Sequence, residues 1–403
     1  MRIKFIGVSG HLESGAPGHF ETFHKGLFDA FRIKLGEGNS LFLGLKDRSK
    51  QRSWFQPALP RSLTSTIPWI PNRTIRLIGK SNSSVGHAAI LYVYEGSLRN
   101  LLLFGNIARR YENIYLYFNL FGAFKYAKLL KSPIQLRIYR ALFNFASRKL
   151  GSRLILTADT KSFAGVIGNK LRKNFQEFPM YSVIESDKTN LSTKDRILIN
   201  FRGDSSEELF KRAIEDFVDL RNIGIDVHGI HQSHLRTYLS NFQNIQILPD
   251  QIPEYVYKQS FKKCKRVAFL YDPKFFSMQS SGRLADAVVS GCQIVVPRDT
   301  ALEQALIEFG NGSSFNFDSP SSLVSALTNE PQLRKSSSDL PTSGRTVELI
   351  LQSVKSRIET CEGERIGYFA KALNLVVDEI VRALLGVLRV AFGVGKTFKK
   401  KLR

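Results

Sequence analysis

The fold class is clearest in residues 267–312, which read VAFLYDPKFFSMQSSGRLADAVVSGCQIVVPRDTALEQALIEFGNG. An apolar run ends at Tyr271, a polar Gln-Ser-Ser-Gly turn follows it, and a helix is predicted over about residues 283–290. Gly291 suits the left-handed position that often closes a helix, and the apolar run at residues 293–297 is typical of a buried strand. A strand, a helix and a second strand in this order predict a βαβ unit with parallel strands.

The same alternation of strand and helix patterns extends along most of the chain. Strands are predicted at residues 1–8, 89–94, 113–118, 153–157, 196–201, 225–230, 245–248, 267–271 and 293–297, the last of these being the final well-defined strand. Helices are predicted between them, for example over about residues 20–31 and 206–220. Residues 49–76 show no clear period and predict a long irregular surface loop. The fold class is therefore α/β with largely parallel sheets.

The length and two polar segments predict the domain organisation. A chain of 403 residues with 43% hydrophobic residues is long enough for two cores. Polar runs at residues 186–194 and 329–344 are typical of linkers. We therefore predict one βα-repeating domain over residues 1–186 and another over residues 195–330. A helical return segment and a basic amphipathic tail are predicted over residues 345–403.

The charge indicates an anionic partner. The chain has 58 Lys and Arg against 35 Asp and Glu, a formal net charge of +23. Nucleic acid, acidic lipid headgroups and phosphorylated substrates all suit such a surface. The sequence has no zinc-finger spacing, no RNP-like strand and no basic region followed by heptads, so no nucleic-acid partner is expected.

The cysteines and the N-terminus indicate a cytoplasmic protein. The three cysteines lie far apart without a CxxC spacing, which favours neither a zinc site nor a disulfide framework. Such usage is typical of a reducing compartment. The first apolar run is short and is followed at once by glycines, so it is typical of a buried strand and not of a signal peptide.

The tail has a wide apolar face and ends in Lys-Thr-Phe-Lys-Lys-Lys-Leu-Arg. An amphipathic helix with a basic end is one way of lying on an anionic membrane surface. A helix packed on the protein with a solvated basic tip is equally compatible with this pattern. The first interpretation predicts a cytoplasmic protein that is peripheral at the inner face of the cell membrane.

The start of the helix over residues 283–290 is the strongest candidate for chemistry. Unpaired backbone N–H groups and the positive end of the helix dipole attract phosphate there. The small residues Ser280, Ser281 and Gly282 allow a diphosphate to approach, and Arg283 adds positive charge. An ordinary strand–turn–helix with a serine N-cap would have the same sequence.

The order Tyr-Asp-Pro, Ser-Ser-Gly and Asp-Ala-x-x-x-Gly-x-x-x-Val-x-Pro resembles the C-terminal domain of GT-B glycosyltransferases of the retaining group-1, family 4-like type. The resemblance covers about residues 196–327 and is weaker in the first half. It implies two Rossmann-like domains that face a central cleft. It also implies a hexosyltransferase that moves a sugar from a nucleotide-sugar donor to a glycan or lipid-linked acceptor in cell-surface polysaccharide synthesis. Neither a metal nor another cofactor is expected.

The resemblance also implies roles for single residues. Asp286 stands where the family has a Glu that binds the donor ribose, whereas Met278 replaces a second Glu near the sugar. In the family, a strand is followed by Gly and a basic residue that pairs with the diphosphate. Here Arg202 beside Gly203, or Lys211 on the next helix, would serve, although either is equally compatible with a solvated surface charge. Tyr271, at a strand end, is assigned to the same donor site.

The first half contributes two candidate catalytic residues. Residues 7–20 form a glycine-rich loop after the first strand, a loop that GT-B enzymes place at the cleft. His19 in this loop is predicted to bind acceptor or phosphate, although a lone His is more often structural. Asn119 stands where retaining members often have His after a strand.

Two alternatives stay open. A non-catalytic GT-B relative that binds a nucleotide-sugar or a glycan is favoured by Met278 and Asn119, because both stand at positions that are catalytic in the family. A basic protein that binds a membrane surface is favoured by the charge of +23 and by the tail.

Overall fold

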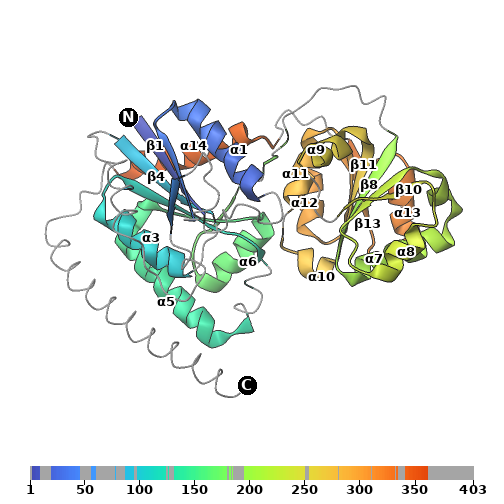
Figure 1. Ribbon diagram of the computed structural model, residues 1–403. Helices are drawn as coiled ribbons and strands as arrows, with labels where there is room; N and C mark the ends of the chain where they lie inside the picture. Colours follow the sequence, from blue (N-terminus) through green and yellow to red (C-terminus); the bar gives the residue numbers. More distant parts are fainter. Residues whose placement is uncertain are drawn as a thin grey trace, which may run out of the picture.

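The computed structural model describes residues 2–9, 20–45, 56–59, 78, 87–94, 98–123, 126, 131–178, 181–182, 184, 195–249, 254–279, 281–309, 311–331, 333–334 and 341–361. These residues form two domains that lie side by side, each a parallel sheet with helices on both faces (Figure 1). The predicted α/β fold with two Rossmann-like domains is confirmed.

The first sheet has the strand order β3-β2-β1-β4-β5-β6-β7, and every neighbouring pair is parallel. All seven residues of β5 are buried, as expected for a central strand covered on both faces. The strands are β1 (Arg2–Val8), β2 (Ser40–Leu45), β3 (Gln56–Leu59), β4 (His87–Val93), β5 (Ile114–Leu120), β6 (Leu154–Ala158) and β7 (Gln176–Glu177).

Helices from both ends of the chain cover the first sheet. One face packs against α3 (Leu98–Arg110), α5 (Pro133–Leu150) and α6 (Lys161–Leu171), with a short 3-10 turn at Gly151–Arg153. The other face packs against α1 (Phe20–Leu35) and α14 (Ser343–Cys361). The chain therefore returns from the second domain to complete the first, and the Lys34 Nζ lies 2.9 Å from Glu348 Oε1 between these two helices.

The second sheet has the order β10-β9-β8-β11-β12-β13-β14, parallel except for the last pair. Its strands are β8 (Arg196–Arg202), β9 (Ile225–His228), β10 (Ile245–Ile247), β11 (Cys264–Tyr271), β12 (Gln293–Pro297), β13 (Asn311–Phe315) and β14 (Leu333–Arg334). One face carries α7 (Asp204–Asp216), the 3-10 turn Val218–Asn222, α8 (Ser233–Leu239) and α13 (Pro320–Thr328). The other carries α9 (Glu254–Lys263), α11 (Gly282–Val289) and α12 (Ala301–Phe309), and α10 (Pro273–Phe276) follows β11.

Two predictions of local structure were wrong. The predicted loop over residues 49–76 contains the edge strand β3, whose Pro57 is tolerated because an edge strand leaves one row of backbone groups unpaired. Strand β12 is not the last strand, since β13 pairs with it. The β13 sequence Asn-Gly-Ser-Ser-Phe has only one large apolar residue and so lacks a strand pattern, and its Gly312 lies directly against the Ile294 backbone, where a side chain would not fit.

The predicted tail helix lies outside the described residues beyond Cys361. Among the helices that the structure does describe, none is sufficiently long and apolar to cross a membrane. The membrane-surface role of the tail stays a prediction.

Arg153 offers a test of how the first domain is held together. Its buried guanidinium Nη1 donates to the carbonyls of Ala108 and Tyr111, both at 2.9 Å, and of Ile114 at 3.3 Å. We expect Arg153→Ala to lower the free energy of unfolding by about 3 kcal/mol, because buried carbonyls lose a charged donor. Urea denaturation of the full chain measures this loss. The control Arg148→Ala, exposed on α5, should change it by less than about 0.5 kcal/mol, and an equal loss in both variants would contradict the assignment.

Candidate functional site

The carboxyl ends of the parallel strands form one edge of each sheet, where open α/β sheets bind ligands. At this edge of the second sheet, Arg202 at the end of β8 lies in register with Tyr271 at the end of β11. The Arg202 side chain is exposed and forms no ion pair with another described residue. Gly203 follows with φ 97°, a conformation that a residue with a side chain rarely adopts, and is the N-cap of α7.

A carboxylate braces this edge. The Ser205 hydroxyl at the start of α7 donates to Asp272 Oδ2 at 2.6 Å, and the backbone N–H of Lys274 donates to Asp272 Oδ1 at 2.8 Å. Asp272 therefore fixes the loop after β11 against the start of α7, and so positions the neighbouring Arg202 backbone, whose carbonyl accepts from Asp272 N at 3.4 Å.

The start of α11 lies at the same edge and has no side-chain cap. Ser281 is its N-cap in an extended conformation, but the serine hydroxyl makes no capping hydrogen bond. Gly282 is exposed, with open space where a side chain would lie. The first N–H groups of the helix are thus available for an anion. Ser280, which was predicted to share this site, lies outside the described residues.

The Arg283 side chain points toward the sheet and not toward the solvent at the helix start. Its Nη1 lies 2.6 Å from Asn200 Oδ1 and 2.7 Å from His228 Nδ1, at the ends of β8 and β9. The guanidinium also lies 5.7 Å from the centre of the Tyr257 ring. The positive charge of Arg283 therefore lies between α11 and strands β8 and β9, in a cluster of polar side chains.

Asp286 is buried one turn further along α11. Its Oδ1 accepts from the Ser182 hydroxyl at 2.8 Å and its Oδ2 accepts from the Tyr257 hydroxyl at 2.6 Å. Burial, with the charge of Asp286, raises the pKa of Tyr257 well above its ordinary value, so this hydroxyl keeps its proton. The predicted contact with a donor ribose stays a prediction, and in this structure both carboxylate oxygens have protein partners.

Ser182 lies where the two segments that connect the domains meet. Its backbone N–H donates to the Pro341 carbonyl at 2.7 Å, and it forms a parallel bridge with Thr342. Tyr181 packs into the core of the first domain, whereas Ile184 packs into that of the second. Asp286 therefore ties α11 to the crossing between the domains.

Met278 makes a second contact between the domains. Its carbonyl accepts from the Thr160 hydroxyl at 2.7 Å, and its side chain packs against the core of the first domain. Thr160 is also the N-cap of α6. Met278 is half-buried, and a carboxylate in its place would lose part of its hydration against apolar side chains.

Two residues that were predicted to bind the donor nucleotide, Lys211 and Tyr271, have their side chains in contact with other residues of the second domain. Lys211 lies two turns into α7, with its Nζ 3.8 Å from Glu215 Oε1 and 5.9 Å from the centre of the Tyr238 ring. Tyr271 is buried and packs its ring 4.5 Å from that of Phe276, between centroids. The structure thus gathers Arg202, Gly203, Ser281 and Gly282 at the edge, with Arg283 and Asp286 beneath it.

At the facing edge of the first sheet, Asn119 is fully buried. Its Oδ1 accepts from the Thr157 hydroxyl at 3.0 Å, and its Nδ2 has no hydrogen-bond partner among the described residues. This side chain lies within the sheet and does not reach the surface. Its catalytic role stays a prediction, as does that of His19, which lies outside the described residues.

Sequence reasoning missed Glu207. This fully buried carboxylate accepts from the backbone N–H groups of His231 at 2.7 Å and Gln232 at 3.1 Å. It therefore fixes the loop after β9 at the binding edge. Gly229 in that loop has φ 85°, and a side chain there would approach the Phe201 carbonyl to 2.9 Å. A glycine directly after a strand was a signal for such a loop, but nothing near Glu207 in sequence marks it as buried.

Similar solved structures show which fold this is. No protein-family model and no curated protein matches the chain. Sucrose-phosphate synthase from Thermosynechococcus elongatus matches with 12% identity and a TM-score of 0.52, covering 96% of this chain and 100% of that one. UDP-GlcNAc 2-epimerase from Neisseria meningitidis, bound to UDP-GlcNAc, matches with 10% identity and a TM-score of 0.51, over 88% and 100%. S. aureus MnaA with UDP matches with 14% identity and a TM-score of 0.50, over 89% and 97%.

These likenesses, with the two facing sheets, show that the chain has the GT-B fold. The identities are too low to show more than the fold.

Asp286→Ala tests the connection between α11 and the domain crossing. We expect the free energy of unfolding in urea to fall by about 3 kcal/mol, because the buried hydroxyls of Tyr257 and Ser182 lose a charged acceptor. Asp216→Ala, exposed on α7, is the matched control and should stay within about 0.5 kcal/mol of the unchanged protein. A similar small change for Asp286→Ala would show that its contacts do not stabilise the fold.

Proposed function

We propose that this protein is a glycosyltransferase that moves a sugar from a nucleotide-sugar donor to a glycan or lipid-linked acceptor in cell-surface polysaccharide synthesis. The observation that supports this most is the second-domain edge, where an exposed guanidinium and an uncapped helix start occur together. Arg202, beside Gly203, would pair with the diphosphate, since its planar fork suits phosphate oxygens. The N–H groups at Ser281 and Gly282 would bind the same group.

The proposed reaction uses this positive charge. The bond between the sugar carbon and the donor phosphate oxygen breaks, and the diphosphate leaves with the electron pair. The acceptor hydroxyl oxygen forms the new bond to that carbon, and its proton passes to an oxygen of the leaving diphosphate. Groups fixed before the reaction stabilise the charge that develops on the diphosphate, which is an efficient form of catalysis. Retention of the anomeric configuration belongs to the proposal through the family resemblance alone.

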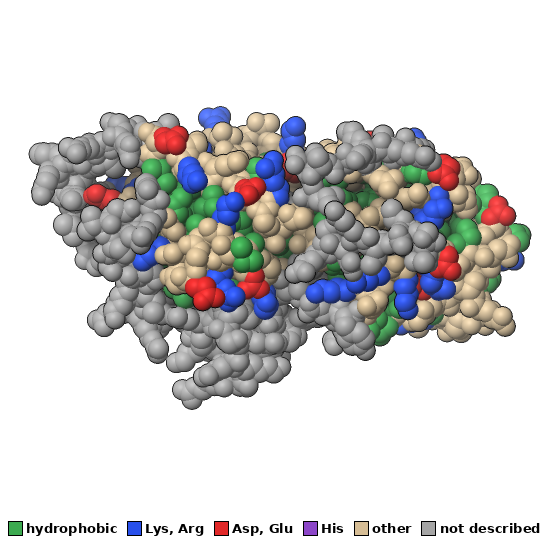
Figure 2. Space-filling view, turned by 90° about the horizontal axis from the view of Figure 1, so that it is seen from above, with side chains coloured by type: hydrophobic (Ala, Val, Ile, Leu, Met, Phe, Trp, Pro, Cys, Tyr) green, Lys and Arg blue, Asp and Glu red, His purple; other side chains and the backbone are tan. Residues whose placement is uncertain are grey.

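The surface charge is compatible with an anionic donor but does not select one place for it. Figure 2 shows Lys and Arg side chains on both domains, with Asp and Glu side chains among them. The assignment therefore rests on the geometry of the edge and not on the net charge of +23. Two of the similar structures contain UDP or UDP-GlcNAc, so uridine nucleotides are the first donors to test.

A non-catalytic relative is the second candidate, and the place of Met278 favours it. The position of the family's sugar-contacting carboxylate holds the domains together here, and Asn119 is buried. Release of nucleoside diphosphate from UDP-, GDP- and ADP-sugars separates the two candidates when it is measured with a panel of glycan acceptors and without acceptor. Nucleotide binding with no turnover and no epimerisation on any donor would favour the non-catalytic candidate.

Arg202→Ala tests the donor site directly. We expect the dissociation constant for UDP, or for whichever of UDP, GDP and ADP binds most tightly, to rise about tenfold or more, because a charge-assisted hydrogen bond is lost. Isothermal titration calorimetry measures it. Arg212→Ala, exposed on α7, removes the same charge away from the edge and should leave the affinity nearly unchanged. Equal affinities of Arg202→Ala and the unchanged protein would overturn the assignment.

A further inference from the structure

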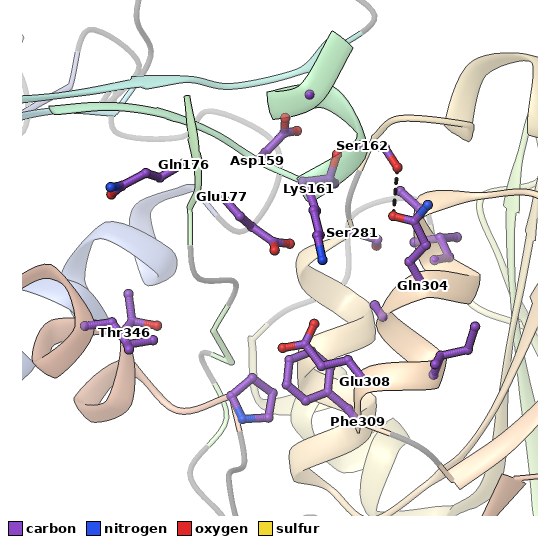
Figure 3. Close-up of a pocket in the computed structure, with 18 of the residues that line it drawn as sticks. Asp159, Lys161, Ser162, Gln176, Glu177, Ser281, Gln304, Glu308, Phe309 and Thr346 are labelled. Atoms are coloured by element: carbon purple, nitrogen blue, oxygen red, sulfur yellow. Dashed lines mark hydrogen bonds between the residues drawn. The ribbon is translucent and has the colours of Figure 1, made fainter. Parts of the chain in front are cut away.

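A large groove lies beside the proposed donor edge, between the two domains. It has a volume of about 1210 Å³ and lies between α6 and β7 of the first domain and α12 of the second, and Thr346 on α14 also lines it (Figure 3). Small-ligand pockets usually measure roughly 300–1,000 Å³. The groove therefore has room for an extended ligand.

The groove lining carries three carboxylates, Asp159, Glu177 and Glu308, against two cations, Lys161 and Arg345. Glu177 comes from the first domain and Glu308 from the second, and Figure 3 shows Lys161 reaching into the space between them. Burial and the nearby Glu308 raise the pKa of the Glu177 carboxyl, and Lys161 opposes this rise. Arg345, the other cation of the lining, has its Nη1 3.9 Å from Glu348 Oε2. On a chain of net charge +23, this groove lacks the excess of positive charge that would attract a phosphate.

Amide side chains supply hydrogen-bond donors beside these carboxylates. The Ser162 hydroxyl donates to Gln304 Oε1 at 2.7 Å across the groove, as Figure 3 shows, and the Ser353 hydroxyl donates to Gln176 Oε1 at 3.3 Å. Both contacts use the amide oxygen and leave the NH₂ group of each glutamine to donate. Acceptor carboxylates and donor amides in one place suit hydroxyl groups, which both donate and accept.

Apolar side chains face the groove from both domains. Val166 on α6 is 37% exposed and Ile307 on α12 is 53% exposed, although both are large hydrophobic residues. Phe309 lies further along the same wall. Single exposed hydrophobic residues are common, but two that face one polar groove from opposite walls form a surface for a ligand with apolar C–H faces. Sugar rings combine such faces with hydroxyl groups.

We propose that this groove binds an uncharged oligosaccharide, which is the acceptor chain of the proposed glycosyl transfer and so rests on that function. The groove is also lined by Asp159 and Thr160 after β6, and by Ser281 at the start of α11. A chain in the groove that contacts Ile307 and Ser281 would thus reach the edge where the donor diphosphate is proposed to lie.

The test uses the full chain and saturation-transfer NMR with maltotetraose, cellotetraose, mannotetraose and galactotetraose. Spermidine and glucose 6-phosphate are the cationic and anionic probes. We expect at least one neutral oligosaccharide to bind, with a dissociation constant about tenfold higher in Gln304→Ala and Ile307→Ala, since each loses a direct contact. The controls Glu208→Gln and Ile134→Ala, exposed on α7 and α5, should bind as the unchanged protein does.

Several results would overturn the assignment. They are an absence of binding by every neutral oligosaccharide, tighter binding of spermidine or glucose 6-phosphate than of any neutral chain, or equal binding by the groove variants and the controls.

Titration with UDP, or with the nucleotide that binds most tightly, separates this inference from the proposed function. The groove variants should keep nucleotide affinity, and Arg202→Ala should keep oligosaccharide affinity. Oligosaccharide binding in the groove without sugar transfer from any donor would contradict both the acceptor role of the groove and the proposed transferase activity. The groove would then be a glycan-binding site only. Transfer that proceeds equally well in Gln304→Ala and Ile307→Ala would sink the groove assignment alone.

Discussion

Hydrogen bonding between parallel strands is the constraint on which the rest of this structure depends. A parallel strand must be followed by a crossover, usually a helix, so every strand of a sheet ends at the same edge. In both domains the strands alternate with helices that bury the two faces, and the strand ends remain open to a ligand. The exposed Arg202, the left-handed Gly203 and the start of α11 share one edge for this reason.

Helix α11 lies at that edge and also takes part in the contacts that hold the two domains together. The residues just before it contact the first domain through Met278 and Thr160, and its second turn contacts the domain crossing through Asp286 and Ser182. A ligand at the start of α11 would therefore lie between two contacts that fix the domains relative to each other. The same contacts hold Met278 and Asp286 at positions where the family resemblance predicts groups that touch the donor, and the contact of Asp286 with a donor ribose stays a prediction.

Two polar regions of different character lie close together between the domains. The edge combines the exposed Arg202 guanidinium with a helix start that has no side-chain cap, which suits an anion. The groove combines charges of both signs without an excess of positive charge, amides and apolar side chains, which suits an uncharged polyhydroxyl chain. Ser281 belongs to both, so a donor and an acceptor would meet at the start of α11.

The fold class, most of the strands and the turn that opens α11 were predictable from the sequence, because these features depend on periodicity and turn residues within a few positions of one another. Strands β2, β3, β7, β13 and β14 were not predicted. The short sequences of β3 and β13 lack an apolar pattern, and these strands form by pairing with a neighbouring strand. The contacts of the site residues could not be predicted from the sequence, because they come from segments that are distant along the chain. Asp286 accepts a hydrogen bond from Ser182, which lies 104 positions away in the sequence. Thr160 donates to Met278, which lies 118 positions away. No local sequence pattern could predict either contact. The burial of Glu207 and the groove between α6 and α12 likewise arise from packing between distant segments.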